Sequence, residues 1–489
     1  MKKYDVVIAG YGLSGALAAY WCSELGLSCC VLEKKPYAGG ISILAGGEVR
    51  CSSDANKTFD YLKHTNNGTC PDDVLMALAN GMTEIYDDLK KIALEVGSVP
   101  KYTKTTDSEV AQLHYGFPGW DSLDVARIEE ADSIDLQKDY PNAVPRSQAV
   151  GWKLYGTVDK VVRKRNVPIY FNTPITKVDR ESRTVNDTFM YDKLIFATGG
   201  FEADPELQSR NWQLGPVLHN GFDGNTGDGI KMVNSWGAEN WHMWHFHAGY
   251  GFKHPAGFGI RLKGLGAWNP TQRHLAKSHK PVNHIVVDQN GRRFMNEWTS
   301  YYSDTGARAM DYFDSDAVKY PRVPSYFIST EQGRLDGPWG SVTFNMPGVD
   351  YKNWSDDNIA EIESGMIKKF YTLTEVAEFI GCDVTTLSET FDKVNTGNDE
   401  FNRPDECAID LTPPYYVAPV YPTVGNTQGG PRHDLNHQPI NPFGEVVDEN
   451  VYVIGDCGSS FGWLYMSAGN WAECFVSAKN SVHHIKNNQ

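Results

Sequence analysis

A glycine-rich turn close to the N-terminus most constrains how this chain can fold. Residues 4–9, YDVVIA, predict a buried strand because β-branched residues form a short apolar run. GYGLSG follows and places Gly10, Gly12 and Gly15 in the G-x-G-x-x-G spacing, with a helix expected over about residues 14–25. Gly10 would form the tight turn, Gly12 would let the backbone approach a pyrophosphate, and Gly15 would allow the helix to pack closely on the strand.

The segment after this helix completes a dinucleotide-binding pattern. SCCVLE predicts a second strand that ends in Glu33, an acid placed to accept a hydrogen bond from a ribose 2′-OH. The helix N-terminus offers N–H groups and a positive dipole to the phosphates. Strand, turn, helix, strand and acid in this order predict an α/β dinucleotide site, and the alternative is a glycine-rich turn in an unrelated α/β unit.

Later segments favour FAD over NAD as the dinucleotide. DKLIFATGGFEAD places residues 197–200 after a strand, and NVYVIGDCGSS places residues 455–456 after another, where the late acid can reach the ribityl chain. Residues 38–51 form a glycine-rich loop suited to close approach of a flat ring. No second dinucleotide fingerprint is visible. The residues expected to bind FAD are Gly10, Gly12, Ser14, Gly15, Glu33, Lys34, Gly40, Ser42, Gly46, Gly47, Ile175, Ala197, Thr198, Gly199, Asp228, Gly455, Asp456, Ala468 and Asn470.

Composition excludes several other classes of protein. A net charge of −16 over 489 residues argues against nucleic acid as a partner, because phosphate binding needs a basic surface. The nine cysteines form no Cys-x-x-Cys pair, which predicts free thiols in a reducing compartment. Asp5 and the turn at Gly10 interrupt any signal-like apolar run, and no stretch of 18 apolar residues predicts a membrane span. We therefore expect a cytoplasmic location.

Several motifs together resemble a known superfamily. In chain order they are the N-terminal fingerprint, GGISILAGG, ATGGFEAD, NTGDGIKM, DQNGRRFMNE and the ending IGDC…AGN. They are similar to the motifs of flavoproteins of the fumarate reductase and 3-ketosteroid dehydrogenase superfamily. The resemblance implies an α/β fold in which a Rossmann-like FAD domain of the two-dinucleotide-binding type is interrupted by an α+β domain that caps the substrate. The expected bounds are 1–247 and 414–489 for the FAD domain and 248–413 for the capping domain.

The chain departs from the fumarate reductases of this superfamily at the positions that bind a dicarboxylate. Those enzymes hold the substrate with arginines and a histidine, and an arginine delivers the proton. The matching positions here are Tyr301, Asn426 and Met466, and Ile260 lies near the position of an acidic residue of the proton relay. A dicarboxylate without those cations would keep unpaired charge in a closed site, which is costly. Fumarate is therefore not the expected substrate.

Phenol and hydroxyl groups take the place of those cations. In 3-ketosteroid Δ4-(5α)-dehydrogenases the closing motif looks like Tyr-x-Ser ahead of the final helix, with another tyrosine after the Asn-Glu segment. This chain has Tyr465, Ser467 and Tyr301 there. The resemblance implies that Tyr465 transfers the proton beside a ketone, that Ser467 tunes or relays it, and that Tyr301 hydrogen-bonds the keto oxygen. The alternative is that Tyr465 only packs and Ser467 is the N-cap of a final helix over about residues 468–485.

A histidine-rich stretch and several absent motifs complete the expectations. Residues 241–252, WHMWHFHAGYGF, predict a strand with His245 and His247 on one face. No further ligand pattern follows, so no metal is expected. The resemblance places a histidine of this stretch near substrate or flavin, and Tyr302 competes with Tyr301 for the role of hydrogen-bonding the keto oxygen.

Covalent flavin attachment in the family needs a histidine in the GGISILAGG region, which has none, so FAD is expected to bind noncovalently. The chain has no Cys-x-x-Cys-His haem motif, so an external electron carrier is expected.

The leading hypothesis is an FAD-dependent oxidoreductase that transfers hydride between flavin N5 and the β carbon of a cyclic, steroid-like ketone or enone. One alternative is an enoate reductase similar to fumarate reductase, which would hold its carboxylate with Arg261, Lys263 or Arg432. An alternative of another class is a flavin-binding subunit that only passes electrons. The sequence leaves open the substrate, the physiological direction, the electron partner and the oligomeric state.

Overall fold

The computed structural model describes residues 1–107, 116–141, 150–262, 282–297, 307–341, 354–396, 399–403 and 405–488. The chain divides into two compact units, which are described separately. Unit 1 comprises Met1–Leu207, Phe222–Phe246 and Asn426–Gln489, and unit 2 comprises Gln208–Gly221 and His247–Gly425. Residues 208–221, 247 and 414–425, expected in the FAD domain, therefore belong to unit 2.

The main sheet of unit 1 places four strand ends side by side. Its parallel strands follow the order β6-β2-β1-β9, with β20 paired to β9. The register aligns Ala9 of β1 with Leu32 of β2 and Phe196 of β9, and Phe196 with Val453 of β20. A β7–β8 hairpin extends the sheet in antiparallel fashion. The strands are β1 Lys2–Ala9, β2 Cys29–Leu32, β6 Ile169–Tyr170, β7 Val178–Asp179, β8 Thr184–Val185, β9 Phe189–Phe196 and β20 Val451–Val453.

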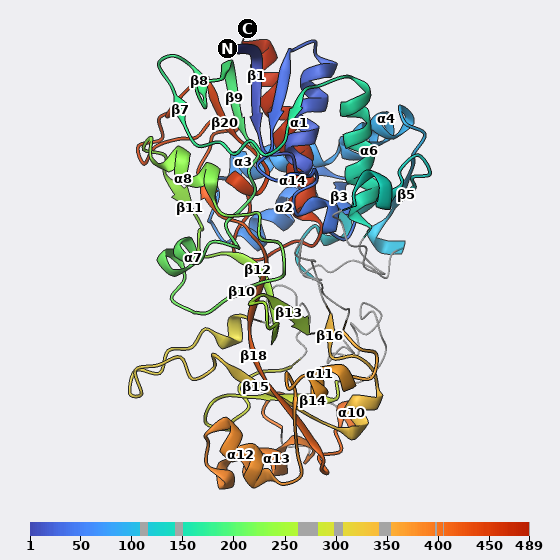
Figure 1. Cartoon of the computed structure of the whole chain (residues 1–489), viewed down its shortest axis with the longest axis vertical. Coiled ribbons are helices and arrows are strands. Elements are labelled where there is room, and N and C mark those ends of the chain that lie inside the picture. The colour runs from blue at the N-terminus through green and yellow to red at the C-terminus, as the bar shows by residue number, and fades with distance from the viewer. Residues whose placement is uncertain are drawn as a thin grey trace. The chain divides into compact units, whose positions relative to one another are not determined.

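Helices flank this sheet (Figure 1), and smaller sheets belong to the same unit. Helix α1 is buried on all sides from Leu13 to Cys22 and packs against the last helix, α14. The helices of unit 1 are α1 Leu13–Glu24, α2 Ala55–Asn66, α3 Asp72–Met82, α4 Ile85–Leu94, α5 Leu136–Asp139, α6 Gly151–Lys164, α8 Asp228–Asn234 and α14 Gly469–Asn487, and α7 Pro205–Asn211 crosses the unit boundary. The smaller sheets are β3 Glu48–Ser52, β5 Leu123–Glu130 and β4 Val99–Thr103, and β11 Asn240–Trp241 with β19 Gly430–Pro431.

Unit 2 is built on a separate sheet with the order β14-β15-β18-β12-β13-β16, to which β10 and β17 add on β18. Helices α12 and α13 bury their apolar faces against β14, β15 and β18. A capping box of Thr372 and Glu375 starts α12, and Gly381 in the left-handed region ends it. The elements are β10 Leu218–His219, β12 Phe246–Lys253, β13 Gly259–Leu262, β14 His284–Val287, β15 Ser325–Thr330, β16 Gly340–Ser341, β17 Lys368–Phe370, β18 Tyr415–Thr427, α10 Glu331–Leu335, α11 Ile359–Glu363, α12 Leu373–Ile380 and α13 Val384–Val394.

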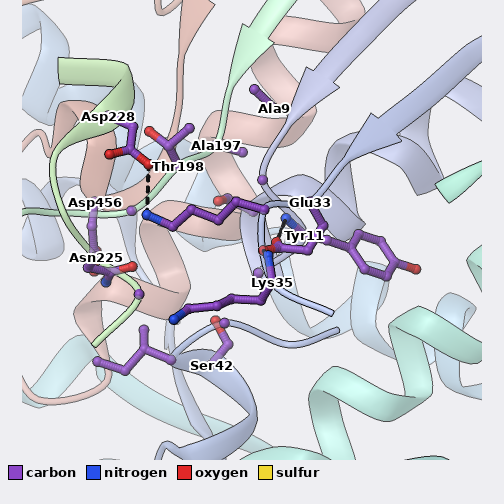
Figure 2. Close-up of a pocket in the computed structure, with 18 of the residues that line it drawn as sticks. Ala9, Tyr11, Glu33, Lys35, Ser42, Ala197, Thr198, Asn225, Asp228 and Asp456 are labelled. Carbon is purple, nitrogen blue, oxygen red and sulfur yellow. Dashed lines mark hydrogen bonds and ion pairs between the residues drawn. The ribbon is translucent and has the colours of Figure 1, made fainter. Parts of the chain in front are cut away.

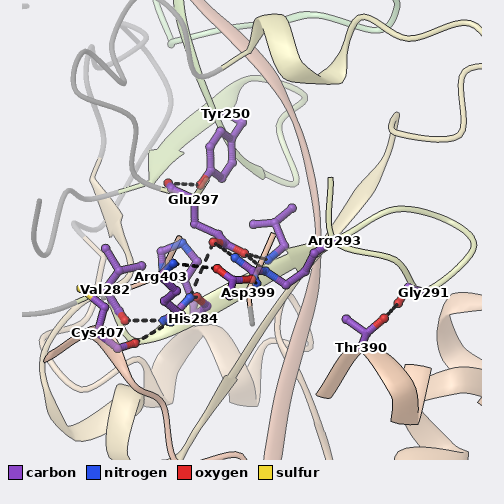
Figure 3. A network of polar contacts seen from close by, with 11 residues as sticks. Tyr250, Val282, His284, Gly291, Arg293, Glu297, Thr390, Asp399, Arg403 and Cys407 are labelled. Atoms are coloured by element: carbon purple, nitrogen blue, oxygen red, sulfur yellow. Dashed lines mark hydrogen bonds and ion pairs between the residues drawn. The ribbon is translucent and has the colours of Figure 1, made fainter. Parts of the chain in front are cut away.

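The DQNGRRFMNE motif forms a buried ionic network inside unit 2 (Figure 3). Arg293 donates two hydrogen bonds to Glu297, at 2.6 and 2.7 Å, and also pairs with Asp399. Arg403 lies 3.6 Å from Glu297, and its side chain donates to the carbonyls of Val282 and Cys407. All four charged side chains are at most 4% exposed. The two cations and two anions therefore compensate one another away from water.

Two of the expectations, namely free thiols and the lack of a membrane span, can be compared with the described residues. None of the nine cysteines, all of which lie in described segments, forms a disulfide. Within the described ranges, no helix combines the length and the apolar character needed to cross a bilayer.

Candidate functional site

A cavity lies at the carboxyl ends of β1, β2 and β9 in unit 1, where the turn after each strand begins (Figure 2). It encloses about 730 Å³, including space open to solvent. In open α/β sheets this edge is where ligands bind. The lining residues are Ala9, Gly10, Tyr11, Gly12, Leu13, Ser14, Leu32, Glu33, Lys34, Lys35, Gly40, Ile41, Ser42, Thr173, Ile175, Ala197, Thr198, Gly199, Phe222, Gly224, Asn225, Asp228, Asp456 and Cys474.

The three glycines of the first turn differ in what surrounds them. Gly10 has a φ of +102°, and a Cβ there would lie 2.3 Å from the carbonyl oxygen of Ala197. A Cβ on Gly15 would lie 2.0 Å from the carbonyl oxygen of Gly10, so these two positions exclude side chains for reasons of packing. A Cβ on Gly12 would have nothing nearer than Ser42 Oγ at 3.6 Å. Only at Gly12 does the missing side chain leave space that a ligand can occupy.

Glu33 lines the cavity, and its carboxylate holds the backbone of the glycine-rich turn after β1. Its carboxylate accepts hydrogen bonds from the backbone N–H groups of Tyr11 and Lys35, both at 2.8 Å. Burial raises the pKa of Glu33, and these two hydrogen bonds and the neighbouring lysines oppose that shift. Each carboxylate oxygen can accept more than one hydrogen bond, so a ribose hydroxyl remains a suitable additional donor.

A pair of charges joins two distant motifs along the same cavity. Lys34 follows β2, and its Nζ lies 2.7 Å from Asp228 Oδ2 at the start of α8 and 2.8 Å from Thr226 Oγ1. Asn225, also labelled in Figure 2, lines the same cavity and donates to Glu202 at 2.6 Å. Burial raises the pKa of Glu202 to about 8. The NTGDGIKM motif thus contributes Asn225 and Asp228 to the wall of the cavity.

The C-terminal part of the chain contributes a second acid. Asp456 follows β20 and accepts a hydrogen bond from Asn470 Nδ2 at 2.5 Å. Burial raises the pKa of Asp456 to about 6, against the opposing effect of Asn470. Asn470 is the second residue of α14, so this contact places the N-terminus of that helix next to the cavity wall. A cavity with open space at Gly12, a helix N-terminus at its wall and acids at two strand ends fits FAD.

Replacing Gly12 with alanine tests whether a ligand uses the open space. The backbone there has φ −77° and ψ −167°, which alanine adopts without strain, so the protein is expected to fold normally. The added methyl would occupy the pyrophosphate position, and we expect FAD affinity to fall by about tenfold or more, equivalent to about 1.4 kcal/mol. Titration of the FAD-free protein with FAD measures this. Unchanged affinity, with unchanged stability of the FAD-free protein, would contradict the assignment.

The raised pKa of Asp456 predicts a pH dependence of the FAD-free protein. The folded state binds a proton at this group up to about pH 6, whereas the ordinary pKa of the side chain is 3.8. Its contribution to stability is therefore fully present below pH 4 and is lost as the pH rises through about 6. Thermal unfolding followed between pH 4 and pH 7 should show a shallower decline in Asp456→Asn than in the native protein. Parallel curves would show that Asp456 does not titrate in this range.

Most of the residues expected to bind FAD line this cavity, and a smaller group does not. The exceptions are Gly15, Gly46, Gly47, Gly455, Ala468 and Asn470. Gly455 packs on Ser14, where a Cβ would lie 2.8 Å from Ser14 Oγ, and Gly47 packs on Val150. Sequence reasoning missed several other lining residues, of which Tyr11, Asn225, Thr173 and Phe222 are examples. Of these examples, only the first two carried a signal, because they lie inside motifs already singled out.

The segment before α14 is held by a buried arginine. Arg50 of β3 is 1% exposed, and its Nε donates to the Ser467 carbonyl at 2.9 Å. Its backbone N–H donates to the carbonyl of Ala468, the N-cap of α14, whose φ is +65°. Ser467 is therefore not the N-cap of this helix, and no side chain caps it. Tyr465 is buried, 6% exposed, and its ring lies 6.2 Å from that of Phe461.

The histidine-rich stretch does not form the single strand that its pattern predicts. Strand β11 ends at Trp241, residues 242–245 form a turn, and β12 begins at Phe246. His245 therefore precedes the strand that contains His247, and the two residues belong to different units. The turn forms because His242, with φ +33°, hydrogen-bonds Gln428 through Nδ1 and lies 3.3 Å from Cys70 Sγ through Nε2. Burial lowers the pKa of His242 to about 3.

The remaining candidates are not among the described residues that line the cavity. Tyr301 and Tyr302 fall outside the described residues, as does Lys263. Ile260 is fully buried in β13. Arg432 is paired with Glu239, at 2.7 Å. In the described part of the chain, no group of three or more His, Cys, Asp or Glu side chains could hold a metal ion.

Comparisons with known proteins agree with this geometry. The chain is 24% identical to 3-oxosteroid 1-dehydrogenase of Mycobacterium tuberculosis, over 96% of this chain and 95% of that protein. It is 21% identical to fumarate reductase of Schizosaccharomyces pombe, over 96% and 87% of the two chains. Its fold is similar to that of 3-ketosteroid delta1-dehydrogenase from Sterolibacterium denitrificans, with a TM-score of 0.78, 18% identity and complete coverage of both chains.

These likenesses confirm the superfamily that the motifs indicate, and with it an α/β flavoenzyme fold. A family model described as an FAD binding domain matches residues 5–471, almost the whole chain. The chain therefore belongs to the FAD binding domain family and is an FAD-dependent oxidoreductase related to 3-ketosteroid dehydrogenases and fumarate reductases.

Proposed function

We propose that this enzyme transfers hydride between flavin N5 and the β carbon of a cyclic, steroid-like ketone or enone. The observation that carries the proposal is the position of Tyr465, a buried phenol four residues before the first residue of α14. The same helix reaches the wall of the FAD cavity through Asn470 and Asp456. A 3-oxosteroid 1-dehydrogenase among the relatives, and a similar structure solved with 1,4-androstadiene-3,17-dione, support a ring ketone as the substrate class.

Bound FAD supplies the site that accepts or donates hydride, and the chain must supply the rest of the chemistry. In this proposal Tyr465 transfers the proton at the carbon next to the one that exchanges hydride, as a general acid or base. Tyr301 hydrogen-bonds the keto oxygen and stabilises the negative charge that develops there. Ser467 tunes or relays the proton of Tyr465. The N-terminus of α14 favours negative charge beside it, by about 0.3–2 kcal/mol.

The binding of FAD is proposed to be noncovalent. Residues 34–50 contain no histidine, and none of the side chains that line the cavity is a histidine. Precipitation of the protein in acid should therefore release all of its FAD into the supernatant. Flavin that stays with the protein pellet would contradict this part of the proposal.

A fumarate-reductase-like enoate reductase is the second candidate, and the fumarate reductase among the relatives favours it. A carboxylate substrate would need a free cation. Arg432, one of the three cations considered for that role, is already paired with Glu239. This pairing weakens the enoate hypothesis relative to the ketone hypothesis.

The deciding experiment is anaerobic. The bound flavin is photoreduced, and a panel of cyclic enones, steroidal enones and enoates is added while flavin reoxidation is followed by its absorbance. Rapid reoxidation by enones supports the proposed function. Reoxidation by enoates alone would replace it with the second candidate. A flavin that no member of the panel reoxidises, but that an artificial electron acceptor does, would indicate an electron-transfer subunit that depends on a separate carrier.

A further inference from the structure

His433 has an unusual hydrogen-bonding environment in unit 1. It is 2% exposed; its Nδ1 lies 2.7 Å from the carbonyl oxygen of Asp434 and its Nε2 lies 2.8 Å from that of Gly458. A carbonyl oxygen can only accept, whereas a neutral imidazole has a single N–H to donate. Flipping the imidazole ring by 180° would not resolve this, because carbon atoms of the ring would then take the positions of the two nitrogens. They would lie much closer to the carbonyl oxygens than the usual C–H···O distance of about 3.3–3.6 Å. The geometry fits an imidazolium, in which both nitrogens donate.

A buried carboxyl group lies on the other side of a serine from this ring. Glu473, in the second turn of α14, is 1% exposed and accepts hydrogen bonds from Ser459 Oγ, at 2.8 Å, and from the backbone N–H of Ser460. Ser460 Oγ lies 3.3 Å from His433 Nε2. His433, Ser460 and Glu473 also line one cavity of about 260 Å³, a volume that includes space open to solvent. The serine therefore bridges a basic and an acidic group that are both removed from bulk water.

Burial alone would favour the neutral form of both groups. It is the largest cause of the lowered pKa of His433 and of the raised pKa of Glu473, which is about 8 overall. Opposing this, the Asp434 and Gly458 carbonyls raise the pKa of His433, and Ser459 and Ser460 lower that of Glu473. The two groups hold one proton between them in either arrangement. The two short carbonyl contacts decide its position, because with a neutral ring one of them would set two lone pairs against each other.

The other charged or titratable groups around His433 and Glu473 either have partners of their own or do not stabilise the charges of this pair. Asp434 accepts from the backbone N–H groups of Asn436 and Gln438. Arg432 pairs with Glu239. The ring of His437 lies 4.5 Å from that of His433, and burial and His433 both lower its pKa. Asp456 raises the pKa of Glu473.

We propose that His433 and Glu473 form a buried imidazolium–carboxylate pair, bridged by Ser460, that positions the turn next to the FAD cavity. This turn is the 3₁₀ helix Gly455–Gly458, which contains Asp456. His433 donates to its last residue, Gly458, and Glu473 binds the two serines that follow. Asn470, three residues before Glu473, donates to Asp456. The inference rests on the binding of FAD and is independent of the substrate.

Nitrogen NMR of the FAD-bound protein tests the charge state directly. The protein is labelled with ¹⁵N-histidine, and His433 is assigned by the signals that disappear in His433→Asn. At pH 7 we expect both of its ring nitrogens at the shifts of an imidazolium. In Glu473→Gln, which lacks the counter-ion, we expect one protonated and one unprotonated nitrogen. A neutral His433 in the native protein, or an imidazolium that is unchanged in Glu473→Gln, would overturn the pairing.

A double-mutant cycle tests the positioning role. His433→Asn and Glu473→Gln should each lower the Tm of the holoenzyme and weaken FAD binding, because each leaves one buried charge without its partner. The double variant should lose less Tm than the sum of the two single losses. Glu239→Gln, which breaks the more exposed pair with Arg432, is the control and should change neither quantity appreciably. Additive losses of Tm, or native FAD affinity in both single variants, would overturn the proposal. If His433→Asn does not fold, His433→Gln replaces it both in the NMR assignment and in the cycle.

Discussion

Glu297→Gln is expected to lower the free energy of unfolding by about 3–5 kcal/mol, the usual cost of removing one partner from a buried ion pair. Glu297 is fully buried and accepts two hydrogen bonds from Arg293, with Arg403 at 3.6 Å (Figure 3). The substitution keeps the size of the side chain and removes its charge. Asp399, which pairs with Arg293, would then be the remaining anion of this network for its two arginines, which leaves one positive charge uncompensated in the interior.

Equilibrium unfolding in urea, followed by tryptophan fluorescence, measures this loss. Glu331→Gln is the matched control in the same unit, since Glu331 also pairs with an arginine, Arg334, but its side chain is 41% exposed. An exposed pair contributes about 0–1 kcal/mol, so the control should lose at most that much from the pair. Equal losses for the two variants would contradict the role assigned to burial. His284, which lies beside the network, should remain neutral in both because burial and the two arginines lower its pKa to about 3.

Tyr465→Phe should slow substrate-dependent reoxidation of the flavin by about 10²–10⁴-fold, the usual contribution of a positioned general acid or base. Phenylalanine keeps the ring that packs near Phe461, so the fold and the FAD content should be unchanged. Only the hydroxyl, and with it the proton, is removed. The prediction depends on the proposed function, and a ketone substrate identified in the panel is needed to measure it.

Stopped-flow reoxidation of the photoreduced enzyme gives the rate. Tyr452→Phe is the matched control, because it removes a buried hydroxyl of the same unit that bonds His484 at 3.0 Å, away from the proposed chemistry. The control should retain the native rate. An unchanged rate in Tyr465→Phe would mean that this tyrosine only packs, and the search for the proton donor would then turn to the other candidates.

The structural elements that are determined by residues close together in the sequence could be predicted. The first strand, turn and helix follow from a local pattern of apolar residues and glycines, and they extend over residues 2–24 with only the ends displaced. The turn at 242–245 was not predictable, because it depends on a bond from His242 to Gln428, 186 residues away. The same holds for Glu297, whose network needs Asp399 and Arg403. In the candidate site, Arg50 was missed because its contact with Ser467 spans 417 residues.

Because a chain is synthesised from its N-terminus, the residues that line the FAD cavity become available at different times. More than half of the residues that line it lie within the first 42 positions, but Asp456 and Cys474 also line it, and β20 joins the sheet next to β9. A nascent chain that has emerged only as far as the end of unit 2 therefore lacks part of the pocket and one strand of the sheet. We therefore expect tight binding of FAD only in chains that include residues 451–474, and a chain truncated before them should bind FAD weakly or not at all.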